Sequence, residues 1–117
     1  MTPTLVFDKD EPFLAIGSPG GSRIITAVLQ IILNIVDFEQ SLEEATESKR
    51  IHHQWYPDDI DIEENYNQLN QLTDLGYKVD LIDTATCTQS IMMDNGEFIG
   101  VSDLRRPDSL ALGVKND

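Results

Sequence analysis

The longest apolar run of the chain extends from Ile24 to Phe38. Thr26, Gln30 and Asn34 interrupt it at intervals of four residues, so they fall along one stripe of a helix. We therefore expect a helix that packs between layers and has one polar seam. Because many of its residues are β-branched, burial rather than local propensity must hold it helical.

Two pairs of short apolar segments predict two antiparallel hairpins. The first joins residues 4–7 to residues 13–16 across a polar turn that contains a proline. The second joins residues 88–93 to residues 97–101, and its Asn95-Gly96 step favours a type I′ turn.

Further elements follow from capping signals and periodicity. Ser41 and Glu44 have the spacing of a capping box, which predicts a short acidic helix. Residues 65–75 have apolar side chains at helical spacing, and Gly76 is a suitable residue to end that helix. Residues 77–82 alternate like a strand.

The stretch from Asp58 to Glu64 is rich in carboxylates. It has five acidic side chains in seven positions, with Ile60 and Ile62 between them. This alternation predicts an edge strand with a solvated acidic face. Calcium binding is the alternative, although the spacing lacks the glycine of an EF-hand loop.

His52 and His53 raise the alternative of a metal site. Adjacent residues point to opposite sides of a strand, and no third ligand stands at a suitable spacing. We therefore expect no bound metal, and expect both histidines to form hydrogen bonds within a packed segment beside Trp55. The tail over residues 102–117 is weakly patterned, so we expect it to be extended and partly mobile.

Composition narrows the function classes. The 117 residues suit a single domain over 1–117, and a net charge of −13 opposes binding to nucleic acid or anionic membranes. The lone Cys87 excludes an internal disulfide and is expected to be a half-buried packing residue. The longest apolar run is too short and too polar for a membrane span, and residues 1–4 do not resemble a secretion signal.

The glycine-rich stretch Gly17–Ser22 joins an expected strand to the long helix. Gly20 and Gly21 allow unusual backbone conformations just before the positive end of the helix, and we expect Ser22 to cap it. Such a turn can direct amides at an anion or an oxyanion. The pattern matches neither a phosphate-binding loop nor a dinucleotide-binding loop, so a purely structural turn stays open as the alternative.

Several segments together resemble, in order and spacing, the C-terminal part of the small subunit of gamma-glutamyltransferases, also called glutathione hydrolases. The similarity covers nearly the whole chain. The matching segments are Met1-Thr2-Pro3-Thr4, Gly17-Ser18-Pro19-Gly20-Gly21-Ser22-Arg23-Ile24-Ile25-Thr26, Asp37-Phe38, His52-His53-Gln54-Trp55, Thr88-Gln89-Ser90-Ile91 and Ser102-Asp103-Leu104-Arg105-Arg106.

The resemblance implies an α+β fold, part of the αββα sandwich of N-terminal nucleophile hydrolases. It implies that the backbone amides of Gly20 and Gly21 form the oxyanion hole for attack on a gamma-glutamyl carbonyl. Ser18 and Pro19 would shape the loop at the substrate. The family needs no metal or cofactor for this chemistry.

The same resemblance implies that other active-site groups lie outside this chain. The nucleophilic threonine, the acidic residue for the substrate amino group, the arginine for its carboxylate and a serine pair all come earlier in the family. Thr2 and Thr4 match structural positions instead. Leu104 replaces a proline that is usual in the tail, which affects the expected path of residues 102–106.

Three hypotheses follow. The chain is a fragment, inactive alone, whose partners are the remaining N-terminal part of the small subunit, the large subunit and a gamma-glutamyl substrate such as glutathione. Alternatively, it is a stand-alone module without catalysis that forms homo-oligomers through exposed sheet edges. Thirdly, it pairs with a separate chain that bears the threonine. Family members commonly act in the periplasm or outside the cell.

Overall fold

The computed structural model describes residues 3–114 of the chain. Its N-terminal part is the expected hairpin, β1 (Thr4–Asp8) and β2 (Glu11–Gly17), followed by the long helix α1 (Arg23–Val36). The second expected hairpin is β6 (Gln89–Asp94) and β7 (Glu97–Ser102). Asn95 and Gly96 both have positive φ, 49° and 83°, which confirms the type I′ prediction.

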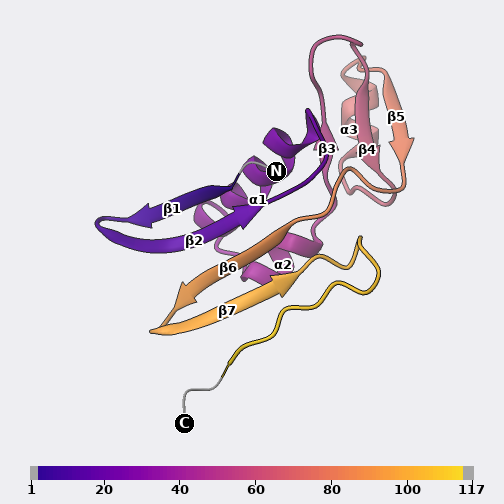
Figure 1. Ribbon diagram of the computed structural model, residues 1–117. Coiled ribbons are helices and arrows are strands. Elements are labelled where there is room, and N and C mark those ends of the chain that lie inside the picture. The colour runs from indigo at the N-terminus through magenta and orange to yellow at the C-terminus, as the bar shows by residue number, and fades with distance from the viewer. Residues whose placement is uncertain (1–2, 115–117) are drawn as a thin grey trace.

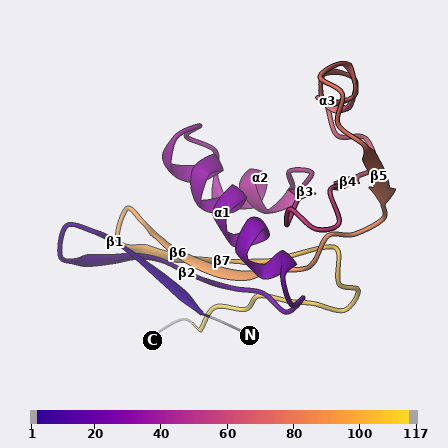
Figure 2. The same cartoon turned by 90° about the horizontal axis from the view of Figure 1, so that it is seen from above.

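The two hairpins lie side by side in one antiparallel sheet of order β1-β2-β6-β7 (Figure 1). α1 and the short helix α2 (Leu42–Glu47) cover one face of this sheet, as Figure 2 shows. Alternation along β2 and β6 sends every second side chain toward the helices. The resulting core consists of Leu14, Ile16, Val28, Ile31, Ile35, Leu42, Ala45 and Met92.

Within residues 3–114, no helix or strand covers the opposite face of the sheet, although the tail approaches it where Ala111 lies beside Gly100. Leu5, Ala15 and Ile91 are register partners on that face, and Leu5 and Ile91 are exposed. The outward side of α1 is also open, with Ile25 73% exposed and Leu29 50% exposed. The prediction that α1 packs between two layers is therefore met on the sheet side only.

A second, smaller sheet contains β3 (Ile51–His52), β4 (Ile60–Glu63) and β5 (Val79–Ile82), in that order. The prediction of an edge strand over the acidic stretch is wrong, since β4 is the central strand. It pairs antiparallel with β3 and parallel with β5. Its carboxylates tolerate this central position because cations from other elements neutralise them, as described below.

The two short helices differ in how well the sequence predicts them. The Ser41 capping box of α2 is present in full, with the Ser41 hydroxyl accepting from the Glu44 amide. α3 (Leu69–Asp74) begins later than residue 65 and buries none of its side chains. Gly76, with φ of 89°, follows its C-terminus as expected.

The tail after β7 contains no helix or strand within residues 103–114, as expected of an extended segment. Its last three residues, 115–117, lie outside the described part of the chain. The radius of gyration, 15.4 Å, exceeds the value of roughly 13 Å typical of a compact domain of this length. None of the helices within residues 3–114 is both long and apolar enough to cross a membrane.

Candidate functional site

The glycine turn connects β2 to α1. Gly17 is the last strand residue and pairs with Gln89, while Gly20 and Gly21 are exposed and have φ of 129° and 60°. The amides of Arg23 and Ile24 donate to the carbonyl oxygens of these two glycines, each at 3.2 Å. This pattern tightens the chain into the first turn of the helix.

The backbone amides of the two glycines are available to a ligand. Within residues 3–114, neither the Gly20 nor the Gly21 N–H donates to a protein acceptor. Both precede the positive end of α1, where an oxyanion or anion is electrostatically favoured. The geometry therefore supports an anion-binding turn.

Ser22 does not cap α1 as predicted. Its backbone is already helical, with φ −62° and ψ −27°, and its side chain forms no capping hydrogen bond. A capping serine normally has extended backbone angles, which bring its hydroxyl over the first turn. The first turn of α1 consequently has no side-chain cap from its own sequence.

Ser18 and Thr86 fasten the turn to the loop before β6. The Ser18 side chain is fully buried, and its hydroxyl lies 2.7 Å from the carbonyl oxygens of Pro19 and Cys87. It also lies 2.9 Å from the Thr86 hydroxyl, which itself donates to the Pro19 carbonyl. Pro19 is exposed beside them.

The two glycines have different surroundings. A Cβ atom on Gly20 would lie 2.6 Å from Thr86 Oγ1, whereas one on Gly21 would meet nothing within 4 Å. Gly20 is therefore required by the neighbouring threonine as well as by its own φ, and Gly21 by its φ alone.

Four charged side chains form a largely buried network that is connected to this turn, namely Arg50, Glu63, Asp103 and Arg105. Arg50 and Asp103, each 1% exposed, form an ion pair of 2.8 Å. Arg105 Nε donates to Glu63 Oε1 at 2.7 Å, and Arg105 Nη1 lies 3.2 Å from Asp103 Oδ1. Opposite charges thus alternate across the network, which is the arrangement that allows ionised groups to be buried.

The pKa values of the two carboxyl groups reflect this pairing. Burial alone raises the pKa of Glu63, but hydrogen bonds from Arg105 and from backbone amides outweigh it and hold the pKa below its usual range. For Asp103, burial is likewise outweighed by the charge of Arg50 and by two backbone amides, so its pKa is also lowered. Both groups are carboxylates at neutral pH.

The network reaches the glycine turn through Thr86. Arg50 Nη1 donates to the Thr86 carbonyl oxygen at 2.7 Å, and the side chain of the same threonine contacts Pro19 and Ser18. Glu63, predicted to face solvent, is fully buried and accepts from the amides of Arg50 and Ala85. The acidic stretch is therefore partly internal, and not a solvated face.

The histidines form hydrogen bonds, as expected. His52 is buried and contacts Thr26 and Gln54, and the more exposed His53 contacts Asp58. Trp55 is 82% exposed, so the segment is less packed than expected. No group of three or more His, Cys, Asp or Glu side chains within residues 3–114 is placed to hold a metal ion, the acidic stretch included. Cys87 is a free, half-buried thiol.

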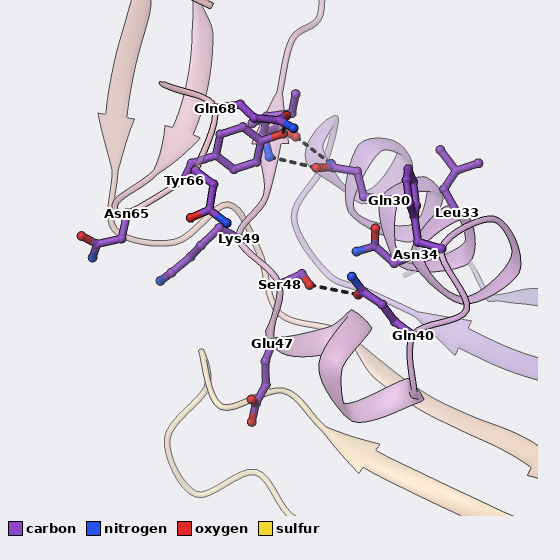
Figure 3. A pocket seen from close by; sticks show the side chains of 13 residues that line it. Gln30, Leu33, Asn34, Gln40, Glu47, Ser48, Lys49, Asn65, Tyr66 and Gln68 are labelled. Carbon is purple, nitrogen blue, oxygen red and sulfur yellow. Dashed lines mark hydrogen bonds between the residues drawn. The ribbon is translucent and has the colours of Figure 1, made fainter. Parts of the chain in front are cut away.

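A hollow among the described residues lies away from the glycine turn. It is a groove of about 590 Å³ between α1 and the segment after β4 (Figure 3). Six of its thirteen lining residues carry carboxamide side chains, namely Gln30, Asn34, Gln40, Asn65, Asn67 and Gln68. It contains no nucleophile paired with a base, so we place the candidate chemistry at the turn.

Sequence reasoning identified the turn but missed the residues that support it. Thr86 stands in a loop without periodicity, and Arg50, Glu63 and Asp103 are charged residues that pattern analysis assigns to the surface. The one available signal was that Asp103 and Arg105 belong to a segment of the family resemblance.

Comparison with known proteins identifies the family of the chain. The family model described as Gamma-glutamyltranspeptidase matches residues 1–113. The glutathione hydrolase proenzyme of Escherichia coli (strain K12) is 44% identical over 116 residues, which cover 97% of this chain and 20% of that protein. The glutathione hydrolase proenzyme of Bacillus subtilis (strain 168) is 37% identical, with the same coverage of each.

Solved structures show the same fold. The crystal structure of the T380A mutant of Helicobacter pylori gamma-glutamyltranspeptidase has a TM-score of 0.83 and 37% identity, covering 91% of this chain and 61% of that one. A cephalosporin acylase from Bacillus halodurans, 18% identical with a TM-score of 0.87, shares the fold alone. The predicted α+β class, as part of an N-terminal nucleophile hydrolase sandwich, is confirmed.

The matched region is only part of each relative. This chain spans about a fifth of the length of the glutathione hydrolase proenzymes that it matches in Escherichia coli and Bacillus subtilis. Within that fifth, the family model accounts for nearly every residue. The chain belongs to the gamma-glutamyltranspeptidase family.

Proposed function

We propose that this chain supplies the oxyanion-binding part of an enzyme that transfers gamma-glutamyl groups to water, an amino acid or a peptide. The observation that carries the proposal is the pair of exposed amides at Gly20 and Gly21, which donate to no protein acceptor within residues 3–114. The family membership of the chain supplies the reaction class.

The chemistry requires such a pair. Nucleophilic attack on an amide carbonyl places a negative charge on its oxygen, and two fixed N–H donors stabilise that charge more than they stabilise the neutral carbonyl. Removal of one such donor typically costs on the order of 3 kcal/mol of transition-state stabilisation. The positive end of α1 adds to the same effect.

Pro19 and Ser18 shape this site in the proposal. Ser18 is too buried to touch a substrate, so its role is to fix the loop through Pro19, Thr86 and Cys87. Pro19 is exposed next to the glycine pair, where it stiffens the turn.

The nucleophile is supplied from outside this chain. By family resemblance, a threonine earlier in the small subunit attacks the carbonyl, and the large subunit completes the substrate pocket. A gamma-glutamyl peptide such as glutathione is the proposed donor substrate, since the relatives are glutathione hydrolases.

An association module without catalysis is the second candidate. It is favoured by exposed apolar side chains on two surfaces. Leu5 and Ile91 lie on the face of the sheet opposite the helices, and Ile25 lies on the outward side of α1. Light scattering separates the two: a module evolved for association forms a discrete oligomer, whereas a catalytic fragment associates without a fixed size.

The test is an activity comparison between two proteins. One is the purified 117-residue chain, and the other is a chimaera in which it replaces the matching fifth of the Escherichia coli proenzyme. We expect the chimaera to release the aniline from a gamma-glutamyl anilide and the chain alone to release none. The Escherichia coli portion without this chain is the control. Release by the chain alone would contradict the proposal.

A further inference from the structure

The glycine turn is fixed firmly on one side only. On the β2 side, the Gly17 ladder pairing and the buried Ser18 hydroxyl hold it. On the α1 side, backbone bonds from Arg23 and Ile24 join the turn to the helix, but no side chain caps the helix, and its apolar contacts with the sheet do not specify its rotation. Directional contacts elsewhere must therefore fix the first turn of α1.

Two such contacts come from the small sheet. His52 on β3 and Asp61 on β4 are direct register partners, so they stand side by side. Asp61 Oδ2 accepts from Arg23 Nε at 3.1 Å, and His52 Nδ1 lies 2.8 Å from the Thr26 hydroxyl. Arg23 and Thr26 are about one helical turn apart, and both lie in the first turns of α1, directly after the glycine turn.

The direction of the His52 contact follows from its other neighbour. The Gln54 side-chain amide donates to the Tyr56 carbonyl oxygen at 3.1 Å, which turns its own oxygen toward His52 Nε2, also at 3.1 Å. His52 Nε2 is then the donor, and Nδ1 accepts from the Thr26 hydroxyl, whose single proton is shared with the more distant Arg23 carbonyl oxygen at 3.2 Å. Because His52 is only 5% exposed, its ring is held in this orientation.

We propose that His52 and Asp61 are positioning residues that aim the Gly20 and Gly21 amides by holding Thr26 and Arg23. This inference rests on the proposed function of the glycine pair. An oxyanion hole works only while its donors point at the developing charge, and a displacement of about 1 Å can cost a hundredfold in rate.

Gln30 offers a matched comparison in the same seam. Its side-chain amide donates to the carbonyl oxygen of Ile51 at 2.8 Å and accepts from the amide of Ile51 at 3.0 Å, so it also docks α1 on β3. It lies seven residues beyond Arg23, or roughly 10 Å along the helix, and its bond to the Thr26 carbonyl oxygen stays within α1. Loss of this contact should weaken docking without releasing the turn.

The first arm of the test uses NMR relaxation of the chimaera, with its glycines labelled with ¹⁵N. In the double variant Thr26→Val/Asp61→Asn, we expect the order parameters of the Gly20 and Gly21 amides to fall from about 0.85 to below 0.6. Thr26→Ser should retain the wild-type values. Gln30→Ala and Asp59→Asn, the latter removing a surface pair with Lys78, should leave both glycines rigid.

The second arm measures kinetics in the chimaera. The double variant should lower kcat by tenfold to a hundredfold with KM changed less than about twofold, because the contacts act on the transition state. Gln30→Ala should keep kcat within about twofold. Unchanged glycine order together with unchanged kcat would overturn the inference, as would an equal loss of kcat in Gln30→Ala.

Failure of the proposed function is a separate result. It is recognised by a folded wild-type chimaera without turnover, or by a Gly20→Ala chimaera with wild-type kcat. In that case the NMR arm still decides whether His52 and Asp61 hold the turn.

Discussion

The two sheets of this molecule are held by different forces. The β1-β2-β6-β7 sheet packs on α1 and α2 through a core of aliphatic side chains, including Leu14 and Ile31. The β3-β4-β5 sheet is attached to the same helices by ion pairs and hydrogen bonds, among them those of Arg50 and Asp61. Apolar packing is strong, but it does not fix the orientation of the packed elements. Hydrogen bonds and ion pairs fix that orientation, and their stability depends on every polar group having its partner.

The glycine turn lies where the two kinds of attachment meet. β2 brings it to the apolar sheet, while Thr86 and the first turn of α1 connect it to the polar one. A site that must aim two amides benefits from this arrangement, since apolar packing gives stability and the polar contacts give orientation.

The largest loss of stability is expected from Asp103→Asn. This change leaves the Arg50 guanidinium, 1% exposed, without its carboxylate partner. Breaking a buried pair from one side costs about 3 to 5 kcal/mol. Urea denaturation of the chain measures it, and a loss below about 1 kcal/mol would show that the network contributes little.

A smaller loss of about 2 to 4 kcal/mol is expected from Ile31→Ala in the apolar layer. Ile31 is 1% exposed, so its truncation leaves a cavity between α1 and the sheet. The same denaturation series provides the comparison, with the exposed Ile25→Ala as its control. If both isoleucines cost the same, the assignment of the core would be wrong.

The response to pH should distinguish the two layers further. The pKa values of Glu63 and Asp103 are lowered in the folded state, so their stabilisation is full above the unfolded values of roughly 4 and is lost as the pH falls through the folded values. Thermal melting at pH 7, 5, 4 and 3 should show this decline, and Glu63→Gln should reduce its slope. Equal slopes in both proteins would contradict the assignment.

The apolar half of the fold was predictable from the sequence. Alternation in both hairpins and the Asn95-Gly96 turn have local physical causes, and the structure confirms them. The capping box at Ser41 is equally local. Such features need no knowledge of distant residues.

The polar half was not predictable in the same way. Glu63 belongs to a run of carboxylates that resembles a solvated strand, and its burial depends on Arg105, which is 42 residues away. α3 begins late because its side chains find nothing to pack against within the described residues. Charge pairing across such separations leaves no periodic signal.

The candidate site likewise has a part that was predictable from the sequence and a part that was not. The glycine turn was visible as a local pattern, and the family resemblance gave Gly20 and Gly21 a role. Thr86, which makes Gly20 necessary, is brought to the turn only by the fold.

The most direct test of the proposed oxyanion site is kcat of the chimaera with Gly20→Ala. The added Cβ would lie 2.6 Å from Thr86 Oγ1, so the Thr86 side chain or the backbone that presents the amides must shift, and the φ of 129° strains any residue with a side chain. We predict a loss on the order of a hundredfold in kcat with little change in KM. Wild-type kcat in a folded Gly20→Ala chimaera would contradict the assignment of this turn to the oxyanion.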